Sequence, residues 1–235
     1  MTQHDRPGLF LNFEGLDGSG FEHHAAALAR LLSREGYRVV LTEEPTKSLI
    51  GGLIRARIAG EWEIAPETLQ LLFTADRAEH LRTKILPALE AGRIVISSRY
   101  LLSALAYNVL LVNDPTWLRA LNSRFPEPDT VFLFKVDPAI CVRRLKATHL
   151  EIDLGKEETK LKRVWQSYNR LASELPYVSM IDGERDDVAI MDELMATVRE
   201  LLHERTTTPA SDTTSAVNPA PLPERKTEEY SEMEQ

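Results

Sequence analysis

The sequence has almost no cysteine, no long hydrophobic run and no excess of positive charge, and each absence excludes a class of protein. A single cysteine, Cys141, excludes an internal disulfide framework and a zinc site made of several cysteines. No apolar run approaches the ~18–20 residues that cross a bilayer, and residues 1–8 lack the apolar core of a signal peptide. The net charge of −8 argues against a general nucleic-acid-binding protein. We therefore expect a cytoplasmic, acidic protein that binds neither membranes nor nucleic acids.

The chain divides into a long body and a short polar tail. A length of 235 residues with 43% hydrophobic residues fits one domain with a sizeable core. Residues 205–235 are rich in Thr, Ser, Pro and Glu and lack the apolar periodicity that offsets the entropy of ordering. We expect one domain over residues 1–204 and a disordered acidic tail over 205–235, acting either as a solubilising segment or as a partner-binding one.

Strand and helix patterns alternate along the body. Short apolar runs typical of buried parallel strands occur at 9–13, 39–42, 94–97, 131–136 and 178–181. Helical periodicity lies between them, at 22–34, 49–59, 67–91, 103–111, 161–175 and 187–203, and Pro138 opens a further helix. The alternation predicts an α/β fold, a doubly wound parallel five-stranded sheet with helices on both faces.

The first predicted strand ends in a glycine-rich turn that leads directly into a helix. Residues 15–20 read Gly-Leu-Asp-Gly-Ser-Gly, the G-x-x-x-x-G frame of a phosphate-binding P-loop in its usual context. The N–H groups of such a turn curl around a phosphate, and the helix N-terminus adds roughly half a positive charge. We define the degenerate loop by Gly15, Asp17, Gly18, Ser19, Gly20, Phe21 and Glu22.

The last two of these residues have the wrong chemistry for a nucleoside triphosphate. A P-loop that binds ATP continues with a lysine for the β- and γ-phosphates and a hydroxyl residue for Mg²⁺. Phe21 removes the positive charge. Glu22 places a carboxylate at the helix N-terminus, where it can accept the free N–H groups as a built-in anion or a helix cap. Both features disfavour ATP.

Together with motifs further along the chain, the sequence resembles the thymidylate kinase (dTMP kinase) family over about residues 8–204. The resemblance rests on FEGLDGSG at 13–20, TEEPT at 42–46, LFTADRAEHL at 72–81, PALEAG at 87–92 with ISSRY at 96–100, and Ser103 with AYN at 106–108. It implies a P-loop nucleoside-monophosphate-kinase fold. It also implies the family's reaction, ATP + dTMP to ADP + dTDP, in dTTP biosynthesis.

The resemblance further implies a pocket for a nucleoside monophosphate. The residues at the matching positions are Phe73, Arg77, Arg99, Ser103, Tyr107 and Asn108. Phe73 would stack on the thymine ring, Arg77 would contact the base or the phosphate, and Arg99 would contact the phosphate. The last three would line the base and sugar, with Asn108 in place of the family's usual Gln. Asp17 would approach the 3′-hydroxyl of the sugar.

The departures from the family pattern converge on the reaction centre. Members read Gly-Lys-Ser/Thr where this chain has Phe21 and Glu22 after the loop. Glu43 replaces the arginine of Thr-Arg-Glu-Pro, and Ser98 replaces the aspartate of Asp-Arg-Tyr. The arginines of the family's lid are missing from residues 148–155. Removing one stabilising donor from an active site typically costs on the order of 10²–10³ in rate, so these changes together indicate abandoned ATP chemistry.

Our first hypothesis is a catalytically impaired pseudoenzyme that still binds dTMP or another nucleoside monophosphate. In it Asp17, Glu44 and Arg99 are vestiges of a catalytic site, and no cofactor is expected. An active dTMP kinase, which would need Mg²⁺, ATP and a lysine such as Lys47 or Lys160 at the phosphates, is the alternative. A module that binds no small molecule is the second alternative.

Two further expectations concern metals and partners. His23 and His24 are adjacent and point about 100° apart on a helix, so they cannot readily share one metal ion, and we expect no metal site. The resemblance implies a homodimer, because the family pairs through helices beside the sheet, or pairing with an active relative.

Overall fold

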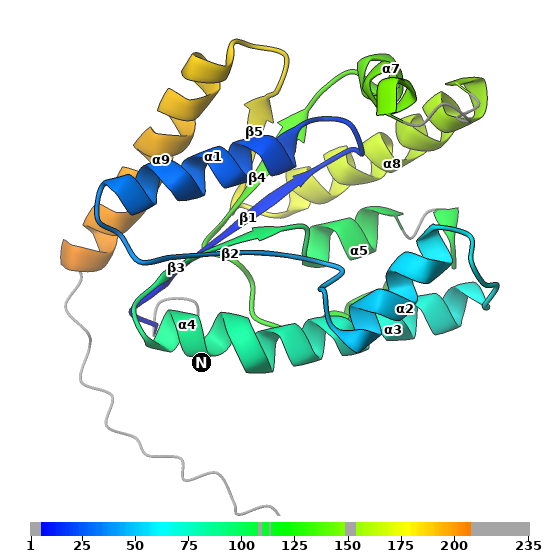
Figure 1. The fold of residues 1–235 in the computed structure, drawn as a ribbon, viewed down its shortest axis with the longest axis horizontal. Helices are drawn as coiled ribbons and strands as arrows, with labels where there is room; N and C mark the ends of the chain where they lie inside the picture. The colour runs from blue at the N-terminus through cyan, green and yellow to red at the C-terminus, as the bar shows by residue number, and fades with distance from the viewer. Residues whose placement is uncertain (1–5, 108–109, 113, 149–153, 208–235) are drawn as a thin grey trace, which may run out of the picture.

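The computed structural model describes residues 6–107, 110–112, 114–148 and 154–207, and it has a five-stranded parallel sheet at its centre (Figure 1). The strands are β1 (Leu9–Gly15), β2 (Val39–Glu43), β3 (Ile94–Ser98), β4 (Thr130–Lys135) and β5 (Val178–Asp182). Their order across the sheet is β2-β3-β1-β4-β5, and every neighbouring pair is parallel. The predicted doubly wound fold is therefore confirmed.

Helices cover both faces of the sheet (Figure 1). One face packs against α1 (Phe21–Arg34) and α9 (Asp187–Thr207). The other face packs against α5 (Leu101–Tyr107), α7 (Pro138–Thr148), α8 (Leu154–Glu174), and a segment formed by α3 (Pro66–His80), η2 (Leu81–Ile85) and α4 (Leu86–Glu90). Outside these layers, α2 (Leu49–Ile58) packs on α3, and α6 (Pro115–Asn122) contacts α5.

The central strand β1 carries two polar residues among apolar ones. Every residue of β1 is buried, with Leu11 and Phe13 facing α1 and α9. On the opposite face, Asn12 donates from Nδ2 to the carbonyl oxygen of Ser97 at 3.0 Å, and Glu14 lies fully buried near the start of α5. Buried polar groups need hydrogen-bond partners, so Glu14 fixes what can pack against this end of the strand.

Several helices differ from the sequence-based expectation, and α8 begins at Leu154 where the expected helix began at 161. The predicted helix 67–91 is interrupted by the π-helical turn η2, because Pro87 has no N–H to donate and its ring crowds the preceding turn. The short helix α6 was not predicted. Its start is fixed by Asp114, whose Oδ1 accepts from the N–H of Trp117 at 2.9 Å, and by Pro115 at the first helical position.

The last helix extends beyond the expected domain boundary at 204. Arg205 lies inside α9 and donates to the carboxylate of Asp129 and, at 2.6 Å, to the carbonyl oxygen of Gly8. These contacts hold the end of α9 against the start of β1. The predicted disordered tail lies, from residue 208 onward, outside the described residues. Within the described ranges, no helix has both the length and the apolar character that a bilayer crossing requires.

Candidate functional site

The glycine-rich loop between β1 and α1 lies at the carboxyl end of the central strand and packs tightly under α7. Gly18 and Gly20 have φ values of 82° and 87°, in the left-handed region that favours glycine. A Cβ atom on Gly18 would lie 2.5 Å from the carbonyl oxygen of Cys141. Arg144 of α7 donates to the carbonyl oxygens of Gly18 and Ser19 at 3.3 and 3.1 Å. The loop is therefore held from outside by an arginine.

Phe21 turns into the protein interior. Its side chain is fully buried within the core between the sheet and α1. The ring lies so close to the strand that a Cβ atom on Gly15 would sit 3.1 Å from Cδ1 of Phe21. On its other side, the Arg99 guanidinium carbon lies 4.9 Å from the ring centroid, a cation–π contact. Position 21 thus contributes a buried ring that supports Arg99, and no cation to the loop.

Arg99 joins the loop to the cavity beside it. Its backbone φ is 64°, a left-handed value that costs energy for a residue with a side chain and that persists because the surroundings fix it. The guanidinium donates to Asp17 Oδ1 at 2.6 Å and to Ser103 Oγ at 3.1 Å. Tyr107 completes the group, since its hydroxyl donates to Asp17 Oδ2 at 2.9 Å. Four predicted site residues therefore form one chain of hydrogen bonds, in the order Ser103, Arg99, Asp17 and Tyr107.

Glu14 is a site residue that the sequence analysis did not single out. Its carboxylate accepts from the N–H of Tyr100 at 2.8 Å, from the hydroxyl of Ser103, and from the hydroxyl of Tyr168 at 3.0 Å. Burial raises the pKa of Glu14, while the Arg99 charge and these hydrogen bonds act against the rise. The signal available in the sequence was a charged residue directly after a mostly apolar run. Glu14 anchors the start of α5 and the middle of α8 at the site.

Arg77 belongs to a buried network of charged and polar groups. It donates from Nε to Glu44 Oε2 at 3.0 Å, from Nη1 to Asn122 Oδ1 at 2.6 Å, and from Nη2 to the carbonyl oxygen of Tyr100 at 3.0 Å. His80 contacts the other oxygen of Glu44 at 3.1 Å. Most of the donors of Arg77 are therefore engaged within the protein. Glu44, expected as a catalytic vestige, is the anion that this network neutralises.

A cavity of about 600 Å³, which we call the central cavity, brings most of the predicted monophosphate residues together. Its lining includes Phe73, Arg77, Arg99, Ser103 and Tyr107, together with Asp17 and Glu44. Asn108 lies outside the described residues. Two further cations line the cavity: Arg57, which was not predicted as a ligand-binding residue, and Lys160, which was expected at the phosphates only in the active-kinase alternative. The remaining lining residues are Pro45, Ile58, Leu69, Gln70, Tyr100, Ala104, Leu110 and Leu111.

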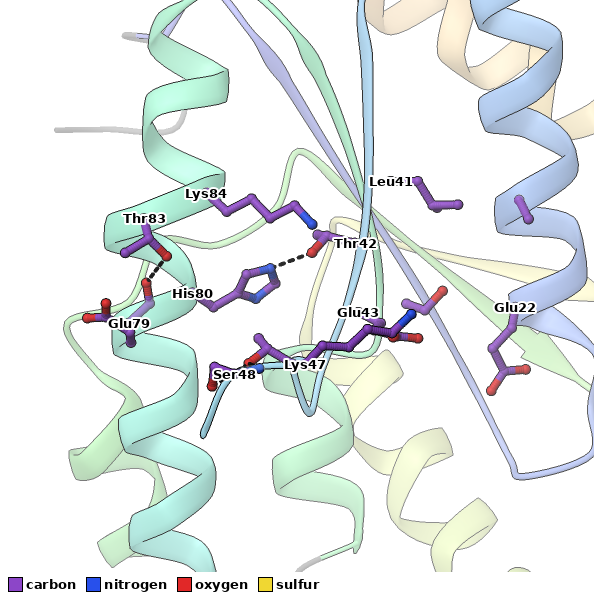
Figure 2. A pocket seen from close by; sticks show the side chains of 13 residues that line it. Glu22, Leu41, Thr42, Glu43, Lys47, Ser48, Glu79, His80, Thr83 and Lys84 are labelled. Atoms are coloured by element: carbon purple, nitrogen blue, oxygen red, sulfur yellow. Dashed lines mark hydrogen bonds and ion pairs between the residues drawn. The ribbon is translucent and has the colours of Figure 1, made fainter. Parts of the chain in front are cut away.

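The acidic substitutions line a second pocket of about 500 Å³, between the start of α1 and the edge strand β2 (Figure 2). Glu22, Glu43 and Ser98 all face this pocket, so three departures from the family pattern gather at one place. The pKa of Glu22 is raised mainly by burial and further by the charges of Asp17 and Glu43, against the opposing effect of Arg99 and of its own N–H. Among the described residues, no group of three or more His, Cys, Asp or Glu side chains could hold a metal ion.

Replacing Arg77 by methionine tests the buried network. Arg77→Met leaves Glu44 as a buried carboxylate without its guanidinium, so we expect the free energy of unfolding in urea to fall by about 3–5 kcal/mol. The double variant Arg77→Met/Glu44→Met removes both charges and should recover part of the loss. Arg82→Met, which breaks an exposed ion pair with Glu79 on the same helical segment, is the control and should change little. Equal losses for Arg77→Met and Arg82→Met would contradict the structural role of Arg77.

Comparison with known proteins agrees with this architecture. The sequence model of the family described as thymidylate kinase matches residues 13–193. The chain is 36% identical over 204 residues to a probable thymidylate kinase of Thermococcus kodakarensis, covering 83% of this chain and 100% of that protein. A probable thymidylate kinase of Pyrococcus horikoshii is 36% identical to this chain over 200 residues. The thymidylate kinase of Bifidobacterium longum is 33% identical over 204 residues. Each of these two alignments covers 83% of this chain and 98% of the relative. The chain belongs to the thymidylate kinase family.

Proposed function

We propose that this protein binds a nucleoside monophosphate, with dTMP as the first candidate, in the central cavity and does not transfer a phosphoryl group to it from ATP. The observation that carries the proposal is the burial of Phe21 under Arg99, at the position where the family resemblance places the phosphate-binding lysine. Phosphoryl transfer depends on positioning and on the neutralisation of spread negative charge. A buried ring provides neither.

Two features around the loop support the loss of ATP and Mg²⁺ chemistry. Glu22 and Glu43 face the pocket beside the loop, and the charge of Glu43 adds to the rise in the pKa of Glu22 that burial mainly causes. A triphosphate would add several negative charges next to them, and at ~4–6 Å such repulsion amounts to several kcal/mol at low effective dielectric. Ser98 offers one hydroxyl where a carboxylate ligand for the metal would be needed. The residues present therefore do not fit Mg²⁺-ATP.

The central cavity supports the retained binding of a nucleoside monophosphate. It has a volume in the usual range for small-molecule sites, an apolar wall that includes Phe73, and polar groups at the loop end. Arg99, Ser103 and Tyr107 converge there, held by Asp17 and Glu14. A phosphate would meet a guanidinium whose position is already fixed, which reduces the ordering cost of binding.

The alternative of an active kinase needs a substitute lysine, and the two candidates are engaged elsewhere. Lys47 is exposed, and its Nζ lies 3.5 Å from Glu43 in the pocket of Figure 2. Lys160 lines the central cavity and pairs with Glu157 at 2.8 Å. Each would have to give up its carboxylate partner to serve ATP, so we place this alternative second.

Nucleotide calorimetry and a coupled assay of ADP release test the proposal. We expect wild-type protein to bind dTMP, to give no heat with millimolar Mg²⁺-ATP, and to turn over far below ~1 s⁻¹, the low end of typical enzyme rates. Phe21→Lys/Glu22→Ser should gain ATP binding if these two positions alone closed the donor site. Phe21→Leu/Glu22→Gln changes the same positions without supplying an ammonium or a hydroxyl, and it is the matched control. Tight Mg²⁺-ATP binding by the wild type would contradict the proposal.

The unfavourable charge of Glu22 predicts a pH-dependent stability. Because burial raises its pKa above the ordinary value of 4.5, the folded state binds this proton more tightly than the unfolded state does. The protonated form of Glu22 is therefore compatible with the folded state at low pH, and the free energy of unfolding decreases as the pH rises through the raised pKa and the side chain becomes charged.

We expect Glu22→Gln to raise the melting temperature at pH 7.5 by up to a few degrees, and the gain to vanish near pH 4. Glu79→Gln is the control, because Arg82 lowers the pKa of Glu79 and its replacement should not stabilise at neutral pH. If Glu22→Gln raised the melting temperature equally at pH 7.5 and near pH 4, the buried charge of Glu22 would be excluded as the cause of the stabilisation.

We also propose that the protein self-associates through α2 and α3. Leu49, Leu53 and Leu71 on these helices are 84%, 41% and 49% exposed, which is high for large apolar side chains. Light scattering should give a mass near twice the 26.6 kDa of one chain. Leu53→Glu/Leu71→Glu should lower the mass to that of a monomer, whereas Val188→Glu, at an exposed valine of α9, should not. A monomeric wild type would refute the proposal.

A further inference from the structure

A further cavity of about 170 Å³, which we call the α6 cavity, lies between the sheet and the helices α5, α6 and α8. It is distinct from the central cavity, because the described linings of the two have only Tyr100 in common. An engineered apolar cavity of about 150 Å³ holds one benzene molecule, so the α6 cavity has room for a single aromatic ring. Most of its wall is apolar, with Leu101, Leu102, Leu105, Phe125, Leu171 and Leu175.

One polar side chain of the α6 cavity has an unused hydrogen-bonding atom. Asn12, on the central strand β1, is fully buried, and its Nδ2 donates to the carbonyl oxygen of Ser97 at 3.0 Å. This contact fixes the orientation of the amide, because a carbonyl oxygen can only accept. The other atom of the amide, Oδ1, has no hydrogen-bond partner among the described residues. A buried acceptor in this state carries its full desolvation cost, so its free energy falls when a bound molecule supplies an O–H or N–H.

The register of the sheet places Oδ1 on the side of the cavity. Asn12 lies between Ser97 of β3 and Val131 of β4. The amide nitrogen occupies the β3 side, so the oxygen is left on the side of Val131. Both Asn12 and Val131 line the α6 cavity. A donor that enters this cavity can therefore meet the unpaired oxygen.

The other amide of the lining, that of Asn122, is fully engaged within the protein. Its Oδ1 accepts from Arg77 at 2.6 Å, and its Nδ2 donates to the carbonyl oxygen of Leu118 at 2.8 Å. The hydroxyl of Tyr100 likewise donates to the carbonyl oxygen of Pro126 at 3.0 Å. Asn12 is thus the amide of the lining that is left for a ligand.

The charged residues of the described lining, Arg119 and Glu127, are exposed and opposite in sign. Arg119 also pairs with Glu174 at 2.8 Å. The rim therefore has no excess of either charge to attract an ion. A charged ligand would also lose its hydration against the apolar wall. The occupant that fits is neutral and apolar over most of its surface.

We propose that the α6 cavity is a second ligand-binding site, for a neutral molecule of the size of one aromatic ring that donates a hydrogen bond to Oδ1 of Asn12. The apolar wall supplies the affinity, and the single acceptor selects molecules with an O–H or N–H group. This inference is independent of the nucleotide proposed for the central cavity.

Calorimetry with phenol and toluene at pH 7 tests the inference, because the two probes have nearly the same size and only phenol has a donor. We expect both to bind the wild type. Asn12→Leu should weaken phenol about tenfold relative to toluene, which corresponds to about 1.4 kcal/mol. Asn169→Leu, the same substitution at an exposed asparagine of α8, is the matched control and should leave both affinities unchanged.

A second variant tests the place of binding. Leu105→Phe adds volume at a half-buried position of the lining and should weaken phenol and toluene equally, by at least tenfold. A wild type that binds neither probe at millimolar concentration would overturn the inference. So would an Asn12→Leu variant that binds the two probes with the same ratio of affinities as the wild type does.

A crystal structure of the wild type with phenol decides the question even if the melting curve of Asn12→Leu shows an unfolded variant. We expect the ring in the α6 cavity with its hydroxyl within hydrogen-bond distance of Oδ1 of Asn12. Phenol bound elsewhere, phenol with its hydroxyl turned toward the rim, or water alone in the α6 cavity would each contradict the inference.

Discussion

The site depends on one arrangement, the Arg99 guanidinium held between the buried ring of Phe21 and the carboxylate of Asp17. The ring lies 4.9 Å from the guanidinium carbon on one side, and Asp17 Oδ1 lies 2.6 Å from Nη2. Ser103 and Tyr107 bind to the same pair, and Glu14 fixes Ser103 from below. The substitution that removes the lysine therefore also supplies the surface on which Arg99 rests. In the function that we propose, the loss of ATP binding and the fixed position of Arg99 share one cause, the buried ring of Phe21.

The two sides of the site follow different electrostatic rules. In the central cavity, Arg77 and Arg99 are each paired with a carboxylate, and the buried charges are satisfied by geometry. Glu22 and Glu43 both line the pocket beside β2, where Glu43 pairs, among the described residues, only with the exposed Lys47 at 3.5 Å, and the pKa of Glu22 is raised, mainly by burial. In the function that we propose, the central cavity accepts a phosphate, and the carboxylates of the second pocket oppose one. This contrast is the electrostatic basis of our proposal that the protein binds a nucleoside monophosphate without transferring a phosphoryl group to it.

The fold was predictable from the sequence, and the details of the site were only partly so. Apolar runs and helical periodicity give the order of elements, because they depend on residues close together in the chain. The interruption of the long helix at η2 and the extra helix α6 depend on Pro87 and on the Asp114–Pro115 cap. These are single residues whose effect periodicity does not show. Arg205 was assigned to the tail because its partner Asp129 is 76 residues away.

The same distinction applies to the functional residues. The family motifs indicated which side chains would gather, and Phe73, Arg77, Arg99, Ser103 and Tyr107 do line one cavity. Their partners could not be inferred, since Arg77 meets Glu44 across 33 positions and Arg99 meets Asp17 across 82. The unpaired Oδ1 of Asn12 is visible only when the residues around it are known. Whether each residue contacts a nucleotide remains a prediction.

A crystal structure obtained with dTMP, Mg²⁺ and a non-hydrolysable ATP analogue together tests the proposed loss of ATP binding most directly. We predict density for the monophosphate in the central cavity, with its phosphate near Arg99, and none for a triphosphate in the β1–α1 loop. Phe21 should remain buried under Arg99. A triphosphate seated in the loop with Mg²⁺ beside Glu22, or Phe21 displaced to admit it, would contradict our interpretation.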